Sequence, residues 1–299
     1  MAQAAPPEPS AGTLRRAARA PFLLRGASMR RFHALLPLLL AAACAPVAAR
    51  PGGPTGPSAP ANVHPGFDAS VYPGEAAMRT WRQESPYRWT GYYLPSPCHR
   101  DASWSGARAT LERMGWGIAV LYVGQQAFED APVAGAQQPG GPVVCSRTLL
   151  SAERGRADAR DAVARASAEG FAPGAVVFLD VERMRAVPES MLAYHSAWTE
   201  ELLRDGSYLP GTYAHQANAA QLFAAARAVY LAAGRADAPP FWIAGGTRFG
   251  LDQPPYAVGL PYARVWQGAF DVDRTWGGVR LRIDENTADR PSPSAPAAP

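Results

Sequence analysis

One stretch, residues 175–182, constrains the fold more than any other part of the sequence. It reads Ala-Val-Val-Phe-Leu-Asp-Val-Glu. The uninterrupted apolar run at 176–179 is typical of a parallel strand buried on both faces, and it ends in two carboxylates, Asp180 and Glu182. Because strand side chains alternate, both carboxylates are expected on one face, roughly 6.5–7 Å apart by the strand rise.

Two like charges this close do not ionise equally easily. One of the pair therefore stays protonated near neutral pH and is a candidate general acid. The alternative is a helix N-cap followed by a surface charge, because Asp-x-Glu is a common sequence.

Short apolar segments alternate with helical patterns from residue 64 onward. Eight strands are expected, near residues 67–70, 90–94, 117–123, 175–181, 211–215, 241–244, 263–267 and 281–284. Five helices are expected, one after each of the first five strands, at 75–84, 104–114, 151–169, 190–204 and 218–233. The pattern predicts an α/β fold, a TIM-like (β/α) barrel of five β/α units followed by three strands. A doubly wound open sheet is the alternative, although no Gly-x-Gly-x-x-Gly follows the first strand.

The N-terminal part of the chain differs from the rest in charge. Six of the 29 basic residues but only one of the 25 acidic residues lie before Ala45, so the remainder nearly balances and no basic stripe indicates nucleic acid binding. Met29-Arg30-Arg31 and the apolar run at 34–43 predict an export leader over residues 1–49, with Met29 as the true start. Residues 50–62 then form a flexible Pro/Gly linker, 63–287 the barrel domain and 288–299 a disordered tail.

Two cleavage sites in this leader stay open. Cleavage after Ala49 releases an exported protein without an anchor, whereas cleavage before Cys44 leaves a cysteine for lipidation and a membrane anchor. Ala41 stands where a lipoprotein signal prefers Leu. Either cut predicts a periplasmic, cell-surface or secreted protein.

Cys98 and Cys145 remain outside the leader, each in a loop after an expected strand. In an exported protein this predicts a disulfide. Zinc binding with His99 is a weaker alternative, because the spacing fits no familiar ligand pattern. The run Asp271-Val272-Asp273 supplies too few oxygens for calcium, so neither a metal nor a cofactor is expected.

A series of motifs resembles family 25 glycoside hydrolases, the Chalaropsis-type lysozymes, in the family's order. The motifs are Gly66-Phe67-Asp68-Ala69-Ser70, Phe178-Leu179-Asp180-Val181-Glu182, Gly211-Thr212-Tyr213, Phe241-Trp242-Ile243-Ala244, Val265-Trp266-Gln267 and Ile283-Asp284-Glu285-Asn286. Two further segments resemble more closely the glycoside-hydrolase-like domain of secreted, mostly actinobacterial proteins, a relative of the lysozymes: Tyr87-Arg88-Trp89-Thr90-Gly91-Tyr92-Tyr93 and Met114-Gly115-Trp116-Gly117 through Tyr122-Val123-Gly124-Gln125-Gln126. The resemblance implies a barrel of five helices and eight strands.

The resemblance also implies roles for four acids, Asp68, Asp180, Glu182 and Asp284. Glu182 becomes the general acid that protonates the glycosidic oxygen. Asp180 orients a substrate acetamido group or stabilises positive charge on the sugar, and the other two set its electrostatic environment. Substrate contacts are expected from residues at or near strand ends, with core packing as the alternative for each ring: Tyr93, Tyr122, Tyr213, Trp242, Trp266 and Gln267.

Three classes of function remain open: a cell-wall glycan hydrolase, a glycan-binding module without catalysis, and an envelope scaffold. The hydrolase is favoured, because burying four acids is costly without a catalytic or ligand-binding use. The expected partner is a bacterial cell-wall polysaccharide, and the expected state is a monomer. The insertion at 125–149, after the third strand, is interpreted as a lid or plug over the barrel mouth.

Overall fold

The computed structural model describes residues 63–127 and 144–296. The predicted leader with Cys44, the linker and most of the insertion after the third strand lie outside these residues. Within the described ranges, no helix has both the length and the apolar character needed to cross a membrane.

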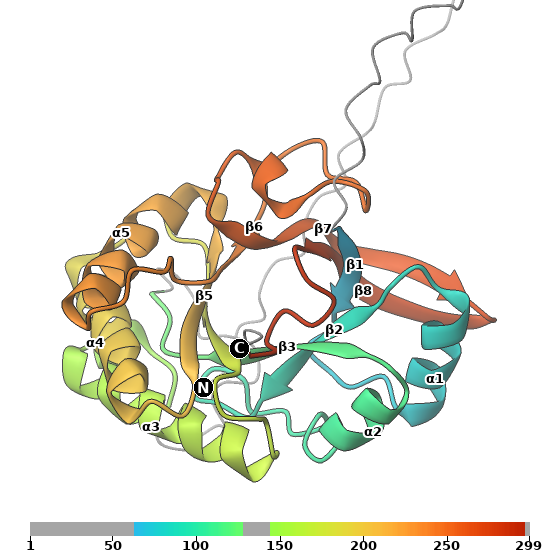
Figure 1. Ribbon diagram of the computed structural model, residues 1–299, viewed down its shortest axis with the longest axis horizontal. Coiled ribbons are helices and arrows are strands. Elements are labelled where there is room, and N and C mark those ends of the chain that lie inside the picture. Colours follow the sequence, from blue (N-terminus) through green and yellow to red (C-terminus); the bar gives the residue numbers. More distant parts are fainter. Residues whose placement is uncertain (1–62, 128–143, 297–299) are drawn as a thin grey trace, which may run out of the picture. The chain divides into compact units, whose positions relative to one another are not determined.

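Eight strands close into one barrel in sequence order (Figure 1). They are β1 (His64–Asp68), β2 (Trp89–Leu94), β3 (Gly117–Val123), β4 (Val176–Val181), β5 (Leu209–His215), β6 (Phe241–Ala244), β7 (Ala263–Trp276) and β8 (Val279–Ala288). The first seven are parallel, and β8 is antiparallel to both of its neighbours, β7 and β1. The predicted TIM-like α/β barrel is confirmed.

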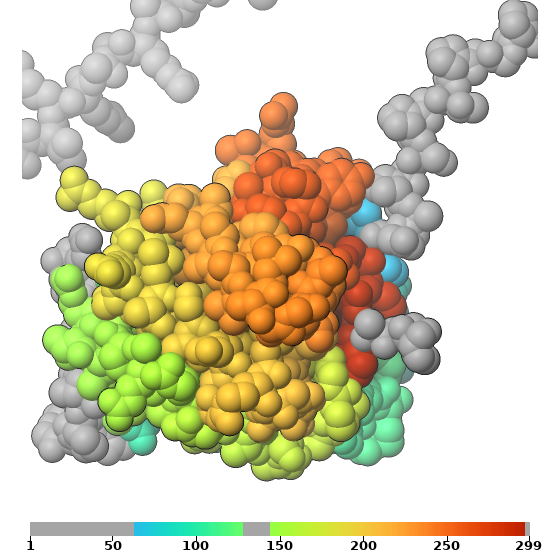
Figure 2. Space-filling view, turned by 60° about the vertical axis from the view of Figure 1, so that its left-hand side comes forward, coloured from blue at the N-terminus to red at the C-terminus, as the bar shows by residue number. Residues whose placement is uncertain are grey.

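One α-helix follows each of the first five strands, as predicted. The helices are α1 (Glu75–Glu84), α2 (Arg108–Arg113), α3 (Ala152–Ala168), α4 (Glu189–Asp205) and α5 (Gln216–Ala232), with short 3₁₀ turns η1 (Arg147–Leu149) and η2 (Pro255–Val258). Figure 2 brings α3, α4 and α5 forward, and they cover this side of the barrel as one outer layer. The last three strands lack helical connections: η2 lies between β6 and β7, and a turn at Gly277 and Gly278 joins β7 to β8. Both glycines have positive φ (55° and 77°), which a tight hairpin turn requires.

Alternation along β4 separates the barrel interior from the helix layer. Phe178 faces the axis, where its ring packs edge-on against Trp242 (5.8 Å between centroids), which in turn meets Trp89 (5.5 Å). Trp89 fits because its partner on β1 is Gly66, where a Cβ would lie 2.1 Å from the indole ring. These rings fill the barrel below the carboxylates, so a ligand can enter only from the carboxyl ends of the strands.

Residues 288–296 are ordered, which corrects the prediction of a disordered tail at 288–299 for that part, and residues 297–299 lie outside the described residues. β8 itself extends to Ala288. The Ser294 amide donates to Ile118 O (2.9 Å), and Ser294 O accepts from the Val176 amide (2.9 Å). The Ser294 hydroxyl accepts from the Val120 amide (2.8 Å). The segment thus satisfies backbone groups at the amino ends of β3 and β4, before these strands pair with each other.

Candidate active site

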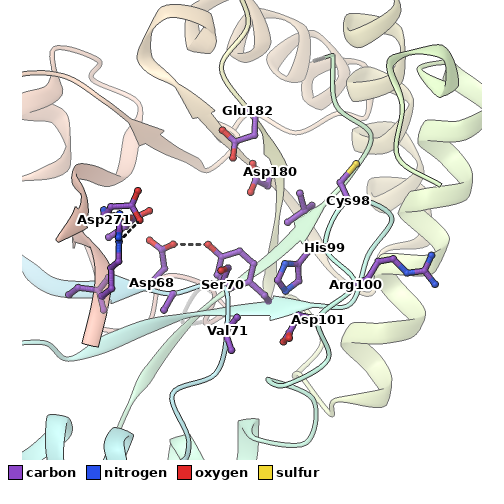
Figure 3. A pocket seen from close by; sticks show the side chains of 16 residues that line it. Asp68, Ser70, Val71, Cys98, His99, Arg100, Asp101, Asp180, Glu182 and Asp271 are labelled. Carbon is purple, nitrogen blue, oxygen red and sulfur yellow. Dashed lines mark hydrogen bonds and ion pairs between the residues drawn. The ribbon is translucent and has the colours of Figure 1, made fainter. Parts of the chain in front are cut away.

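A cavity of about 650 Å³ lies at the carboxyl ends of the barrel strands. Its wall contains all four predicted acids: Asp68 at the end of β1, Asp180 in β4, Glu182 just after β4, and Asp284 in β8. In Figure 3, Asp180 and Glu182 lie together on one side of the cavity and Asp68 lies on another. This is the end of the fold where α/β barrels carry their active sites.

Three side-chain donors hold the Asp68 carboxylate. Its Oδ1 accepts from the Tyr93 hydroxyl (2.6 Å), and its Oδ2 accepts from the Gln267 and Asn286 amides (2.8 Å each). Burial raises the pKa of Asp68 to about 7, and the charge of Asp284 contributes to that rise, although the three hydrogen bonds oppose it. Asp68 therefore titrates near neutral pH while three side-chain donors hold its carboxylate in place.

Gln267 connects Asp68 to a second acid, Asp284, because it donates to both carboxylates. Its Nε2 also donates to Asp284 Oδ2 (3.0 Å), and its Oε1 accepts from the Tyr213 hydroxyl (2.5 Å). Asp284 Oδ1 accepts from the backbone amide of Asp271 (2.6 Å). Asp271 has φ 52°, a left-handed conformation unusual for a non-glycine residue, next to irregularities in the β7–β8 pairing. This local strain turns the Asp271 amide toward the site.

The end of β4 is organised differently. Asp180 is 6% exposed, and its Oδ1 is buried with no hydrogen-bond partner in the described part of the chain. Gln126 fixes the backbone here, because its Nε2 donates to Asp180 O (2.8 Å) and its Oε1 accepts from the Glu182 amide (3.0 Å). The backbone is held while the two carboxylates stay available to a ligand.

The cavity favours protonated carboxyl groups. Burial raises the pKa of Asp180 well above its ordinary value, and the charges of Glu182 and Asp68 add to the effect. Glu182 is more exposed, yet enclosure by the cavity walls raises its pKa too, with a further rise from Asp284 and an opposing hydrogen bond from the Arg183 backbone. Burial likewise raises the pKa of Asp284. The site can therefore hold transferable protons at pH values where free carboxylates are ionised.

Strand register decides which predicted contacts reach the cavity. Paired residues on neighbouring parallel strands point to the same face, and Asp180 pairs with Tyr213, whereas Leu179 pairs with Tyr122. Tyr122 accordingly faces α3, is fully buried and donates its hydroxyl to Asp161 (2.9 Å). The predicted contact between Tyr122 and substrate is therefore wrong.

Both predicted tryptophan contacts are corrected as well. Trp242 is fully buried inside the barrel, where its Nε1 donates to Asn286 Oδ1 (2.9 Å). Trp266 faces away from the axis, packs against Phe249 (5.0 Å between centroids) and donates its Nε1 to Gly245 O (2.7 Å). Core packing accounts for both rings, since neither leaves a face for a sugar.

The other three predicted contacts surround the acids. Tyr93 lines the cavity itself. Tyr213 and Gln267 are 9% and 1% exposed and lie in the hydrogen-bonded layer that supports Asp68 and Asp284.

The loop after β2 forms another part of the cavity wall. Cys98 is bonded to Cys145, with the Cα atoms 5.1 Å apart, which confirms the predicted disulfide. His99 lies against Tyr93 (5.0 Å between ring centroids), and burial lowers its pKa, so its imidazole is neutral at neutral pH. In residues 63–127 and 144–296, no group of three His, Cys, Asp or Glu side chains is arranged to hold a metal ion.

A family model described as "Rv2525c-like, glycoside hydrolase-like domain" matches residues 79–288. The chain belongs to this family. The match to the Rv2525c-like domain includes Asp180, Glu182 and Asp284 and begins after Asp68. The predicted family resemblance is confirmed.

Several solved structures are similar to this Rv2525c-like domain, and the first of these, with a TM-score above 0.5, shows the same fold. An uncharacterized protein of B. stearothermophilus has 20% identity and a TM-score of 0.53, with 76% of this chain and 96% of that chain covered. The Tat-secreted protein Rv2525c of Mycobacterium tuberculosis has 17% identity and a TM-score of 0.44, covering 76% and 95%. The spore cortex lytic enzyme SleM of Clostridium perfringens has 12% identity and a TM-score of 0.46, covering 76% and 67%. Among curated protein sequences there is no match.

Three residues around the acids were not anticipated from the sequence: Gln126, Asp271 and Asn286. For Asn286 a signal exists, because it lies two residues from Asp284 and alternation places both on one face of β8. Gln126 and Asp271 act through the ends and irregularities of strands, where alternation gives no guidance.

Proposed function

We propose that this protein is an exported glycoside hydrolase acting on a cell-wall or envelope glycan by carboxylate acid–base chemistry. The observation that carries the proposal is the set of four acids from β1, β4 and β8 around one cavity, all with raised pKa values. Within the described ranges, no arginine side chain hydrogen-bonds to any of them. Burying four acids in this way costs folding free energy. A role in protonating and stabilising a sugar substrate explains why the protein keeps them there.

Glu182 is the proposed general acid. It lies in the cavity wall after β4, where burial raises its pKa, so it keeps its proton to a higher pH than a free glutamate does. That proton passes to the glycosidic oxygen as the bond to the anomeric carbon breaks, and the bonding electrons leave with the oxygen. Positive charge then develops on the sugar ring.

The remaining acids act on that charge. The free Oδ1 of Asp180 points to a group that supplies a hydrogen-bond donor or positive charge, such as a substrate acetamido N–H or the oxocarbenium-like ring. Asp68 and Asp284, held in place by Gln267, set the electrostatic environment. Tyr93 lies in the cavity wall, where a sugar would contact it, and its hydroxyl donates to Asp68. Water completes the reaction by adding to the anomeric carbon and giving up its proton to a carboxylate.

The proposal extends to location and partners. A bacterial cell-wall polysaccharide is the proposed ligand of a monomeric protein, and Cys44, if lipidated, anchors it to a membrane. Detergent extraction of cell fractions tests the anchor, because Cys44→Ala should release a protein that the wild type keeps in the membrane fraction. A wild-type protein found wholly outside membranes would instead favour cleavage after Ala49.

Turnover on purified cell walls tests the hydrolase directly. Glu182→Gln keeps the size of the side chain but lacks the transferable proton, so release of reducing ends should fall by about 10²–10⁴-fold while glycan binding changes little. Wild-type protein that binds the glycan and releases no reducing ends between pH 4 and 8 would make it a binding module. Protein that neither binds nor cleaves would leave the envelope scaffold.

A further inference from the structure

Five arginines stand out because they make no side-chain hydrogen bond or ion pair with the described residues: Arg100, Arg147, Arg183, Arg185 and Arg248. Each lies in a segment that follows a strand, after β2, β3, β4, β4 and β6, respectively. The arginines of the helices, of the β7–β8 hairpin and of the barrel's amino end all have partners, for example Arg204 with Glu201 (2.5 Å). Within the described ranges, the arginines without any side-chain partner are therefore confined to segments that follow strands, on the side of the barrel that carries the cavity.

Three of these arginines lie on the side of the mouth formed by β4, β5 and β6. We define Arg183, Arg185 and Arg248 as the basic sector. Arg183 directly follows Glu182, and the pKa of His215 at the end of β5 is lowered by burial and, to a smaller extent, by the charge of Arg183. His215 in turn lies against Gly245, where a Cβ would come within 2.8 Å of its Nε2, and Gly245 begins the loop that carries Arg248. The loop after β4, the end of β5 and the loop after β6 are thus neighbours at the mouth, and two of these three segments carry the sector.

The loop after β4 holds its part of the basic sector in place. Met184, between Arg183 and Arg185, is buried, and Asn218 of α5 binds both its amide (2.9 Å) and its carbonyl (3.1 Å). The two flanking arginines are exposed. A rigid backbone with two free guanidinium groups suits a fixed oxyanion better than a neutral hydroxyl, because guanidinium pairs with carboxylates in a planar, two-bond geometry.

Charge differs sharply between the centre of the mouth and this sector. The cavity wall contains six acids and two arginines, Arg100 and Arg282, so it repels a negative group, whereas residues 183–188 contain two arginines and no acid. We propose that the basic sector binds carboxylates carried by the glycan, so that the substrate is an anionic polysaccharide whose uncharged ring portion enters the cavity. This inference rests on the proposed function and names its substrate class.

Binding of three soluble probes to the full-length protein tests the inference. The probes are a chitin hexasaccharide, which has no carboxylate; peptide-free peptidoglycan strands, which carry carboxylates on the sugar; and strands that keep their peptides, with carboxylates on the stems. The charged strands should bind about tenfold more tightly than the neutral probe, as expected for three exposed ion pairs, and this advantage should shrink between 50 and 300 mM salt. Tighter binding of the peptide-free strands assigns the carboxylate to the sugar, and the reverse assigns it to the stem.

Matched variants separate the basic sector from net charge. The triple variant Arg183→Gln, Arg185→Gln and Arg248→Gln should remove the tenfold preference and its salt dependence while leaving binding of the neutral probe unchanged. The control, Arg79→Gln, Arg156→Gln and Arg204→Gln, removes the same charge from the outer helices and should keep the preference. Equal behaviour of the two triple variants, or equal wild-type affinity for neutral and charged probes, overturns this inference and leaves the hydrolase proposal standing. Absence of binding and cleavage with all three probes overturns both.

Discussion

The two sides of the cavity hold their carboxylates in opposite ways. On the paired side, Asp68 and Asp284 accept hydrogen bonds from side-chain amides, a tyrosine hydroxyl and a backbone amide. On the open side, Asp180 and Glu182 receive no side-chain donor in the described part of the chain, and Asp180 Oδ1 is buried without a partner. The protein therefore fixes the carboxylates of the paired side with its own hydrogen-bond donors. The carboxylates of the open side are left for a ligand to hydrogen-bond.

Among the variants that compare the two sides of the cavity, the largest expected effect comes from replacing Asp180 on the open side. Asp180→Asn should lower turnover by about 10²–10³-fold, because the lost carboxylate no longer stabilises developing positive charge. The same variant should be more stable than wild type at pH 8, by on the order of 1 kcal/mol, since a buried carboxylate without donors opposes folding. An acid whose pKa is raised in the folded state destabilises that state increasingly as pH rises above its unfolded pKa of about 3.9, so the gain should vanish near pH 4.

Urea unfolding at pH 4 and pH 8, alongside turnover, measures both effects of Asp180→Asn. Lower stability at pH 8 would mean that the protein itself satisfies Asp180, and the contrast between the two sides would disappear.

A smaller effect is expected from replacing Gln267, which donates to both acids of the paired side. Gln267→Met keeps a similar volume and removes the Nε2 donor shared by Asp68 and Asp284. Because that hydrogen bond lowers the pKa of Asp68, the pKa should rise above its present value of about 7, and turnover should fall by about tenfold through misplacement of both acids. The pH–rate profile and an NMR titration of the Asp68 carboxyl would show the rise.

Tyr213→Phe is the matched control for Gln267→Met. It removes the donor to Gln267 Oε1 and leaves both Nε2 hydrogen bonds in place, so the pKa of Asp68 should move much less. Equal shifts in the two variants would show that Gln267 acts only by filling space.

The disulfide is expected to affect stability more than chemistry. Gln125, the neighbour of Gln126, donates its Nε2 to Val144 O (2.9 Å) and accepts from the Ser146 amide (3.0 Å), on either side of Cys145. Replacing Cys98 and Cys145 by Ser should lower the free energy of unfolding by about 2–4 kcal/mol and reduce turnover a few-fold, because Gln126 then holds the end of β4 less firmly. Thermal unfolding and turnover of the double variant below its transition measure the two effects. A turnover loss as large as that of Asp180→Asn would mean that the disulfide wall itself belongs to the site.

Fold and acids were predictable because they depend on patterns that repeat along the chain. The apolar strand before Asp180, the alternation of strands and helices, and the order of family motifs all point to the barrel, and the barrel brings Asp68 and Asp284 to the same mouth as Glu182. The disulfide followed from two cysteines in loops after neighbouring strands.

The aromatic contacts were less predictable, because proximity to a strand end does not say which face a side chain occupies. Counting alternation from Asp180 through the expected register would have placed Tyr122 and Trp266 outside the barrel. The order of residues 288–296 could not be predicted, for another reason. A Pro- and Ser-rich segment is typical of disorder by composition, and only the unpaired backbone groups between β3 and β4 give Ser292 and Ser294 partners.

The smallest expected effect compares two tyrosines on opposite faces of neighbouring strands. Tyr122→Phe removes a hydroxyl bonded to Asp161 in the helix layer, so it should lower stability by about 1 kcal/mol and leave turnover and its pH profile unchanged. Tyr93→Phe removes a donor to Asp68 inside the cavity, so it should raise the pKa of Asp68 and move the pH profile upward. Chemical denaturation and pH–rate measurements on both variants test the pair. A shift in the pH profile of Tyr122→Phe would mean that the α3 face communicates with the site, whereas an unchanged profile in Tyr93→Phe would remove Asp68 from the groups that govern activity.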